Sequence, residues 1–258
     1  MLTLKIFFIS FSAAVLCALP SYAANKKIKI ELVDTLASWP DKSGLGFAHE
    51  VVTSAFKEVH VDTEVAIVPF DRCIADMTNG DVVGCFSITD SDKLKGKAIL
   101  ANSSLYACHM DYYYNAKTEL TAKKDWQIPA GKKIGVVTGT NYPASVFKLA
   151  QDGSSLSSSS DEDENLRKLA LGQLDFAVIY FNSLKPSIIT VNKAQVGDKV
   201  KFAFRGELLK YYIAFSKKHP DGEWSRRKFD RGFLQLKTSG ALSDIEKRWI
   251  AKISMPSL

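Results

Sequence analysis

The residue types that carry out most enzymatic chemistry are present, but not at the spacings that a catalytic or metal site needs. The four histidines, His49, His60, His109 and His219, show no metal-ligand spacing. There is no G-x-S-x-G elbow, H-E-x-x-H motif or Walker loop. The acidic run 161–164 lacks the central glycine of a calcium loop and is typical of a helix start. The sequence therefore predicts no metal, no cofactor and no catalytic residues.

One local pattern does predict contact with a ligand. Gly139, Thr140 and Asn141 stand between a predicted strand at 134–138 and a predicted helix that begins near Pro143. Free backbone N–H groups and the dipole of a helix start suit an anionic group. Alternatively, these residues form only a capping turn.

The elements that must position such residues follow from hydrophobic periodicity and breaker residues. Period-two runs and short apolar runs predict strands, and apolar stripes at spacings of three and four predict helices. Predicted strands cover 28–34, 64–69, 82–89, 106–115, 134–138, 174–180, 200–205 and 211–216. Predicted helices cover 45–59, 71–78, 143–150, 161–171, 223–237 and 241–250. The serine-rich segment 153–160 reads as a surface loop, although a short edge strand could lie within it. The alternation of strands and helices predicts an α/β fold with mostly parallel sheets.

The N-terminus has the pattern of an export signal. A single charge at Lys5 precedes an apolar run, and 21–23 offers the small residues that a signal peptidase reads. We therefore predict that residues 1–23 are removed and that the protein works in the periplasm. Cys17 raises the alternative of a lipid anchor, but the bulky Leu16 before it disfavours that alternative.

Cleavage after Ala23 would leave three cysteines, Cys73, Cys85 and Cys108. At most one intramolecular disulfide can form among them, and the spacing does not say which pair forms it. The net charge of +6 is spread along the chain. The basic run 226–228 has aromatic neighbours at helical spacing, so it reads as the solvated face of an amphipathic helix rather than a nucleic-acid site.

Several segments in sequence order resemble the type II periplasmic solute-binding proteins, in the group called family 3, which bind polar amino acids. The segment 131–140 resembles the family pattern G-K-x-x-G-V-x-x-G-T, and 169–178 resembles A-L-x-x-G-x-x-D-A-V. Four further segments resemble the opening loop and helix, the G-x-D to T-x-T stretch, the returning strand and the closing helices: 44–47, 79–89, 212–217 and 234–249.

The resemblance implies two α/β lobes, each a mostly parallel sheet flanked by helices, joined by a hinge of two chain crossings. Lobe 1 would comprise 25–108 and 211–258, and lobe 2 would comprise 109–210. The crossings would lie near His109 and Lys210, and such hinges let two lobes close over a ligand.

The resemblance also implies a set of ligand contacts. Ser87 stands where the family uses a hydroxyl at a strand end, and Trp39 lies in the loop that overhangs the pocket. Arg72 falls near the position of a stacking aromatic, where a guanidinium could stack or grip a carboxylate. Tyr180 would offer a ring and one hydroxyl. Each has a structural alternative: local hydrogen bonding for Ser87, surface packing for Trp39, a salt bridge to Asp71 or Asp76 for Arg72, and core packing for Tyr180.

The sequence departs from the family at both groups that grip a zwitterionic amino acid. The expected arginine after Thr89 is replaced by Asp92, and the expected aspartate falls on Tyr180. The predicted ligand is therefore a small polar or anionic solute, which need not be an α-amino acid.

Three functions follow from these observations. The first is a periplasmic monomer that captures a solute and delivers it to an ABC-type membrane permease. The second is a sensory protein that binds a solute and docks on a membrane receptor. The third, less favoured, is a dehydratase-like enzyme in which Asp92 in a dry cleft acts as an acid or base.

Overall fold

We describe the chain from a computed structural model, in which residues 25–34, 45–119, 128–140 and 142–254 are described. Seven helices and nine strands alternate along these residues, as the sequence predicts. Lobe-forming elements in chain order are β1 (Lys26–Val33), α1 (Phe47–Lys57), β2 (Val61–Val68), α2 (Phe70–Asn79), β3 (Gly84–Thr89), β4 (Ala98–Leu100), β5 (Tyr106–Asn115), β6 (Lys133–Val137), α3 (Ala144–Gln151), β7 (Ser155–Ser159), α4 (Glu162–Ala170), β8 (Phe176–Phe181), α5 (Ser187–Lys193), β9 (Val200–Ser216), α6 (Gly222–Ser239) and α7 (Ala241–Ser254).

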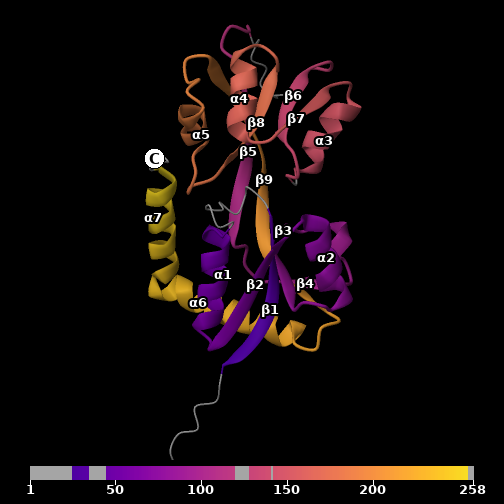
Figure 1. Ribbon diagram of the computed structural model, residues 1–258, viewed down its shortest axis with the longest axis vertical. Coiled ribbons are helices and arrows are strands. Elements are labelled where there is room, and N and C mark those ends of the chain that lie inside the picture. Colours follow the sequence, from indigo (N-terminus) through magenta and orange to yellow (C-terminus); the bar gives the residue numbers. More distant parts are fainter. Residues whose placement is uncertain (1–24, 35–44, 120–127, 141, 255–258) are drawn as a thin grey trace, which may run out of the picture.

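The strands form one hydrogen-bonded path, β2-β1-β3-β9-β5-β8-β6-β7, with β4 paired to β9. Two lobes lie along this path, and the sheet passes between them only through β5 and β9 (Figure 1). The lobes therefore share two long strands instead of having two separate sheets. On either side of this antiparallel ribbon, the outer strands of each lobe are parallel to one another.

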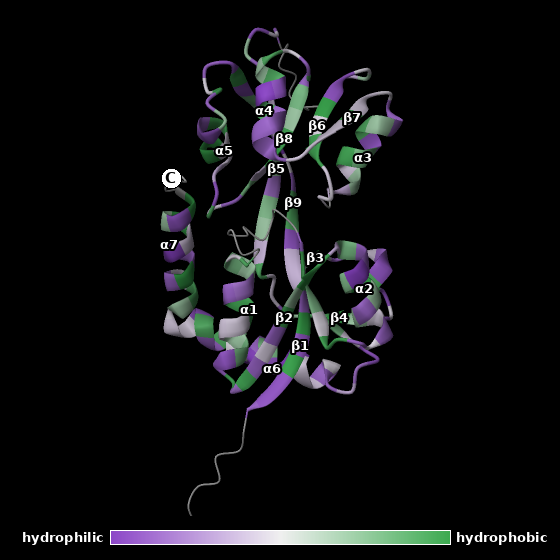
Figure 2. Cartoon of the chain, in the orientation of Figure 1, coloured by the Kyte–Doolittle hydropathy of each residue, from purple (hydrophilic) through white to green (hydrophobic). Residues whose placement is uncertain are grey.

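Helices cover both faces of the sheet in each lobe. In the first lobe, α1 and α6 pack on one face of β1 through Ile30 and Leu32, whereas α2 packs on the other face through Met77. In the second lobe, α3 covers one face, and α4 and α5 cover the other. Apolar residues concentrate along the central strands and the inner helix faces (Figure 2). Burying this apolar surface supplies most of the driving force for folding.

The sequence predicted separate strands at 200–205 and 211–216, and this was wrong. β9 is continuous over 17 residues, although its pairing with β5 shifts register twice. Gly206, between the two predicted strands, allows a close approach to β5: a Cβ there would lie 3.1 Å from the Met110 carbonyl oxygen and from the Tyr112 ring. The hydrogen bonds to β5 keep the chain extended past this glycine.

Two other elements differ from the expectation. The serine-rich segment contains β7, an edge strand parallel to β6, so the alternative of a hidden edge strand is confirmed. Polar side chains are tolerated there because an edge strand is solvated and its pairing depends on the backbone. The short helix α5 was not predicted, because its β-branched residues favour strands; burial of Thr190 and Val191 against α4 and β8 outweighs that preference.

A disulfide joins Cys73 on α2 to Cys85 on β3, while Cys108 on β5 is a free buried thiol. The pairing left open by the sequence is thereby resolved. The bond ties α2 to the centre of the sheet. Within the described residues, every helix is too short or too polar to cross a bilayer.

Candidate functional site

The strand directions bring two sets of strand ends together between the lobes. β5 runs from the first lobe into the second, and β8 is antiparallel to it, so β8 ends toward the first lobe. β9 is also antiparallel to β5, and β3 is antiparallel to β9, so β3 ends toward the second lobe. The parallel neighbours of β3 and β8 follow the same directions. Ligands of open α/β sheets bind at the carboxyl ends of strands, and here both sets of ends face one another.

The register of the ribbon sets the distance between the two sets. Thr89, at the end of β3, pairs with Tyr211, which pairs with Tyr106 on β5. Phe181, at the end of β8, pairs with His109, three residues further along β5. At about 3.3 Å per residue, the strand ends lie roughly 10 Å apart along the ribbon, a span that suits a small molecule.

Ser87 is the most unusual residue at these strand ends. Its φ of 64° is left-handed, and it lies inside β3, where pairing with β9 is irregular between Phe86 and Ile88. The other positive-φ residues that are not glycine, His60 and Gln195, follow helix ends, where this conformation is common. Ser87 is 3% exposed, and its hydroxyl faces the Tyr106 hydroxyl without forming a well-made hydrogen bond to any described residue. Strain and an unsatisfied buried hydroxyl at one strand end are features typical of ligand sites.

Four tyrosines form a column beside Ser87, on the floor between the lobes. The Tyr106 ring stacks on Tyr211 at 4.8 Å, and the Tyr211 hydroxyl donates to the Tyr180 hydroxyl at 3.4 Å. The Tyr180 ring stacks on Tyr142 at 5.9 Å, and the Tyr142 hydroxyl accepts the Val137 N–H. Burial raises the pKa of Tyr106 well above its usual range, and the opposing interaction with the Ser87 hydroxyl is smaller. Burial likewise keeps the pKa values of Tyr180 and Tyr211 above their usual range. The column is therefore neutral at physiological pH.

The structure thus brings two predicted residues, Ser87 and Tyr180, into one aromatic cluster that spans the lobes. Tyr180 is 3% exposed and belongs to the hydrophobic core, as its packing alternative anticipated. Its hydroxyl nevertheless lies one tyrosine away from the ring that adjoins Ser87.

Sequence reasoning missed Glu162, a buried acid at the second lobe's side of this cluster. Its Oε1 accepts the Tyr180 N–H at 2.6 Å, and its Oε2 lies 2.8 Å from Lys185 Nζ. Glu162 is 4% exposed, because the first turn of α4 directs it beneath β8. The acidic run 161–164 predicted only a helix start, and Asp161 does cap α4 by accepting the Glu164 N–H. Nothing in the local sequence distinguishes Glu162 from its solvated neighbours.

Arg72 lies in the first turn of α2, directly after the end of β2, and its side chain is 66% exposed. Its Nε donates to Asp76 Oδ2 at 3.2 Å. This is one of the salt bridges anticipated as the structural alternative. The bond occupies only Nε, so the Nη groups have no hydrogen bond to any described residue and remain available at the edge where the strand ends converge.

Thr140 lies after β6, at the second lobe's strand ends, and is half-buried. The helix predicted to begin near Pro143 is present, since α3 starts at Ala144 with Pro143 as its N-cap. The Thr140 N–H already donates to the Val137 carbonyl in a turn. The predicted contacts at Trp39 and Asn141 lie outside the described residues.

Asp92 does not occupy a dry cleft. It begins a short 3₁₀ helix, its side chain is 89% exposed, and it pairs with Lys95 at 2.5 Å. A solvated, ion-paired carboxylate has no environment that would prepare it for acid–base catalysis. The observation that motivated the enzymatic alternative is therefore contradicted.

An ion-paired network braces β5 against β9 in the second lobe. The Asp111 carboxylate is 1% exposed and accepts from Arg205 Nε at 2.8 Å and Nη2 at 3.1 Å. Ser187 also donates to it at 2.7 Å, and the Arg205 guanidinium stacks over Phe181 at 3.5 Å. The next residues of β9, 206–210, are exposed or half-buried, although Gly206 closely approaches β5 and 208–210 pair with it.

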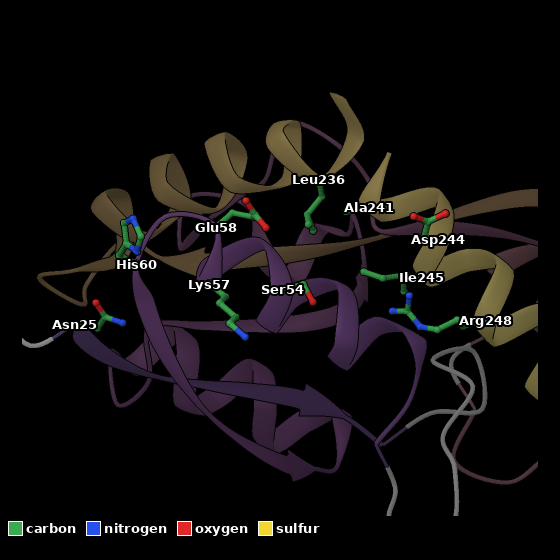
Figure 3. Close-up of a pocket in the computed structure, with 10 residues that line it drawn as sticks. All are labelled: Asn25, Ser54, Lys57, Glu58, His60, Leu236, Ala241, Asp244, Ile245 and Arg248. Carbon is green, nitrogen blue, oxygen red and sulfur yellow. The ribbon is translucent and has the colours of Figure 1, made fainter. Parts of the chain in front are cut away.

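A cavity of about 600 Å³ lies on the far side of the first lobe, between α1, α6 and α7 (Figure 3). Its lining includes Asn25, which precedes β1, and His60, which follows α1. Both lie at the opposite edge of the sheet from the strand ends, and none of the predicted ligand residues that the structure describes lines this cavity. We therefore place the candidate site between the lobes. Among the described residues, no cluster of three or more potential ligands could hold a metal ion.

Comparisons with known proteins connect this geometry to a fold. No protein-family model and no curated protein sequence matches the chain. An ancestral arginine-binding protein bound to arginine is similar with a TM-score of 0.65 and 18% identity, over 88% of this chain and 99% of that one. The amino acid ABC transporter substrate-binding protein AbpA from Streptococcus pneumoniae, bound to L-arginine, has a TM-score of 0.63 and 19% identity over 90% and 97%.

A histidine kinase sensor domain described as similar to periplasmic binding proteins has a TM-score of 0.65 and 16% identity, over 88% of this chain and 96% of that one. These identities are too low to transfer a ligand or a partner, and they establish the fold alone. The chain has the two-lobed α/β fold of the type II periplasmic binding proteins.

Proposed function

We propose that this chain is an exported binding protein that captures a small polar or anionic solute between its lobes and performs no reaction on it. The observation that carries the proposal is Ser87. A strained backbone and a buried hydroxyl without a partner among the described residues lie where the strand ends of both lobes converge. Such a costly arrangement persists where a ligand can satisfy it.

We assign the solute contacts to Ser87 and Arg72 from the first lobe and to Thr140 and Tyr180 from the second. The free Nη groups of Arg72 suit a carboxylate or another oxyanion, since a guanidinium forms paired, charge-assisted hydrogen bonds. The tyrosine column supplies an apolar, neutral floor with ring faces. Trp39 and Asn141 remain proposed contacts from the sequence pattern.

Closure would occur about the two crossings, with 25–108 and 211–258 moving against 109–210. The exposed and half-buried side chains at 206–210 support this boundary, because a segment with solvated side chains has few of them to repack when it bends.

We further propose that residues 1–23 direct export to the periplasm. The Cys73–Cys85 disulfide supports an oxidising compartment, since such bonds persist outside the cytosol. Delivery of the solute to an ABC-type permease, by a monomeric binding protein, is the favoured role.

Sensing is the second candidate, and the similarity to a histidine kinase sensor domain favours it. Both roles need only binding and closure. Genes for a permease and an ATPase beside this one would favour transport, whereas a lone gene for a membrane receptor would favour sensing.

The experiment that tests the proposal is mass spectrometry of solute released from the mature chain purified from periplasm. A compound recovered unchanged, whose affinity falls in Arg72→Ala and Thr140→Ala, supports the proposal. Asp92→Ala serves as a matched surface control, and its affinity should not change. Conversion of the compound by the protein, or equal affinity in all variants, would reject it.

A further inference from the structure

A buried acid lies beneath Arg72, on the face of β1 that α2 covers. Glu31 is 4% exposed, and it stands opposite Ala66 on β2 and Cys85 on β3. Its Oε2 has no hydrogen-bond partner among the described residues. Sequence alternation predicts a polar, solvated position here, but α2 covers it. An unsatisfied buried carboxylate is costly, so the site favours the protonated acid.

Glu31 faces Asp76 of α2 within hydrogen-bonding reach. Two carboxyl groups can form a hydrogen bond only if they share a proton. Burial is the largest cause of the raised pKa of Glu31, which reaches about 7, and repulsion from Asp76 adds to it. Glu31 therefore changes its protonation near neutral pH.

Asp76 connects this pair to the candidate solute site. Its Oδ2 accepts from Arg72 Nε at 3.2 Å, one helical turn away. Asp76 binds only Nε, so the Nη groups keep their donors for another anion. Asp76 is thus a positioning residue between the buried acid Glu31 and the exposed guanidinium of Arg72.

We propose that Glu31 and Asp76 share one proton and that this proton is coupled to the binding of an oxyanion at Arg72. This inference rests on the proposed function of Arg72. With the proton, the two carboxyl groups and the guanidinium sum to zero charge; without it they sum to one negative charge. An oxyanion at Arg72 is then repelled, so anion binding and proton retention favour one another.

The other charges around Glu31 do not replace this coupling. Asp81, which follows α2, adds repulsion of the same sign. Lys29 and Glu64 share the sheet face with Glu31 but lie toward the opposite edge, where Lys27 and then Lys29 lower the pKa of Glu64. Cys85 is held in the disulfide and does not titrate. The Glu31–Asp76 pair is therefore the group whose charge changes beneath Arg72 near neutral pH.

The test uses inorganic sulfate, whose own charge is constant between pH 5.5 and 8.5, on the mature chain. Sulfate binding is followed by NMR through the Arg72 side-chain Nε–H, and the Glu31 carboxyl carbon is followed through its titration. We expect sulfate to bind roughly five- to tenfold more weakly at pH 8.5 than at pH 5.5. Glu31→Gln should abolish this dependence, because an amide cannot ionise.

Asp76→Asn is the second variant; it removes the repulsion but not the burial of Glu31, so the pH dependence of sulfate binding should remain and move to lower pH while the chain stays folded. Glu64→Gln is the matched control and should keep the wild-type slope. A flat wild-type profile, or an unchanged slope in Glu31→Gln, would overturn the coupling. The two claims can fail separately. If Arg72→Ala still captures the periplasmic solute, Arg72 is not a solute contact. If sulfate binding to the wild type nevertheless keeps its pH slope, the coupling between the buried proton and Arg72 stands.

Discussion

Removing the hydroxyl of Ser87 should make the protein more stable and a poorer binder. The hydroxyl is buried without a partner among the described residues, so folding removes it from water without replacing its hydrogen bonds. The penalty for such a group is about 1–3 kcal/mol. Ser87→Ala recovers part of it, and we expect a gain of about 1 kcal/mol in the free energy of unfolding. For a chain of this length, that gain raises Tm by roughly 2–4 °C.

Ser87→Gly should gain a similar free energy of unfolding, with two additional backbone effects that nearly cancel. Glycine adopts the φ of 64° without the left-handed penalty of about 1 kcal/mol. Its greater freedom in the unfolded chain costs about 0.5–1 kcal/mol, which offsets most of that relief.

The binding loss follows from the same hydroxyl. A hydrogen bond to a neutral solute group contributes about 0.5–1.5 kcal/mol, and one to a charged group contributes up to about 3 kcal/mol. The affinity should fall by roughly 3- to 100-fold. Isothermal titration with the solute recovered from the wild-type protein measures this loss, and urea unfolding measures the stability.

Ser225 provides a matched control for Ser87. Its hydroxyl is also buried without a partner among the described residues, but it lies on α6, in the first lobe's helical layer. Ser225→Ala should gain similar stability without losing affinity. If Ser87→Ala is destabilised while Ser225→Ala is stabilised, the Ser87 hydroxyl is structural, and our reasoning is refuted. Unchanged affinity in Ser87→Ala would refute it equally.

Three further predictions concern stability. Glu31→Gln should stabilise the protein above pH 7 but not near pH 4, because the pKa of Glu31 is about 7 against an ordinary 4.5 and its ionisation removes stability as pH rises between these values. The gain in the free energy of unfolding has an upper bound of about 3 kcal/mol, which solvent near the sheet edge reduces to about 1–2 kcal/mol. Urea unfolding at both pH values measures it. Asp111→Ala should lower the free energy of unfolding by about 2–3 kcal/mol in the same assay, because it leaves the partly exposed Arg205 without its buried partner. A loss under about 0.5 kcal/mol would contradict the claim that this ion pair holds β5 against β9. Replacing Cys73 and Cys85 together by Ala should lower the free energy of unfolding by about 3 kcal/mol, because the unfolded chain loses a cross-link between residues 12 positions apart. Calorimetry should show a lower Tm. An unchanged Tm after full reduction of the wild type would argue against the disulfide.

Periodicity predicted most of the fold, because helix stripes and strand runs depend on local burial. It did not predict that β9 is continuous, since the role of Gly206 depends on the close approach of β5. It also missed α5, whose β-branched residues form a helix only because Thr190 and Val191 are buried there. Tertiary contacts outweighed local preference in both places.

The candidate site residues came from the family resemblance and stay predictions. The resemblance suggested Ser87 and Arg72, yet the left-handed backbone of Ser87 has no sequence signal. Glu31 and Glu162 look like ordinary polar positions of a strand and a helix start. Each became a buried acid only through its packing, beneath α2 and beneath β8. Burial of a single polar residue depends on three-dimensional contacts that a pattern of types does not encode.

The most direct test of solute capture between the lobes is a crystal structure of the mature chain with the solute recovered from periplasm. We predict density between the ends of β3 and β8, within hydrogen-bonding distance of the Ser87 hydroxyl and the Arg72 guanidinium. Density in the cavity between α1 and α7, with the Ser87 hydroxyl still unbonded, would contradict this account.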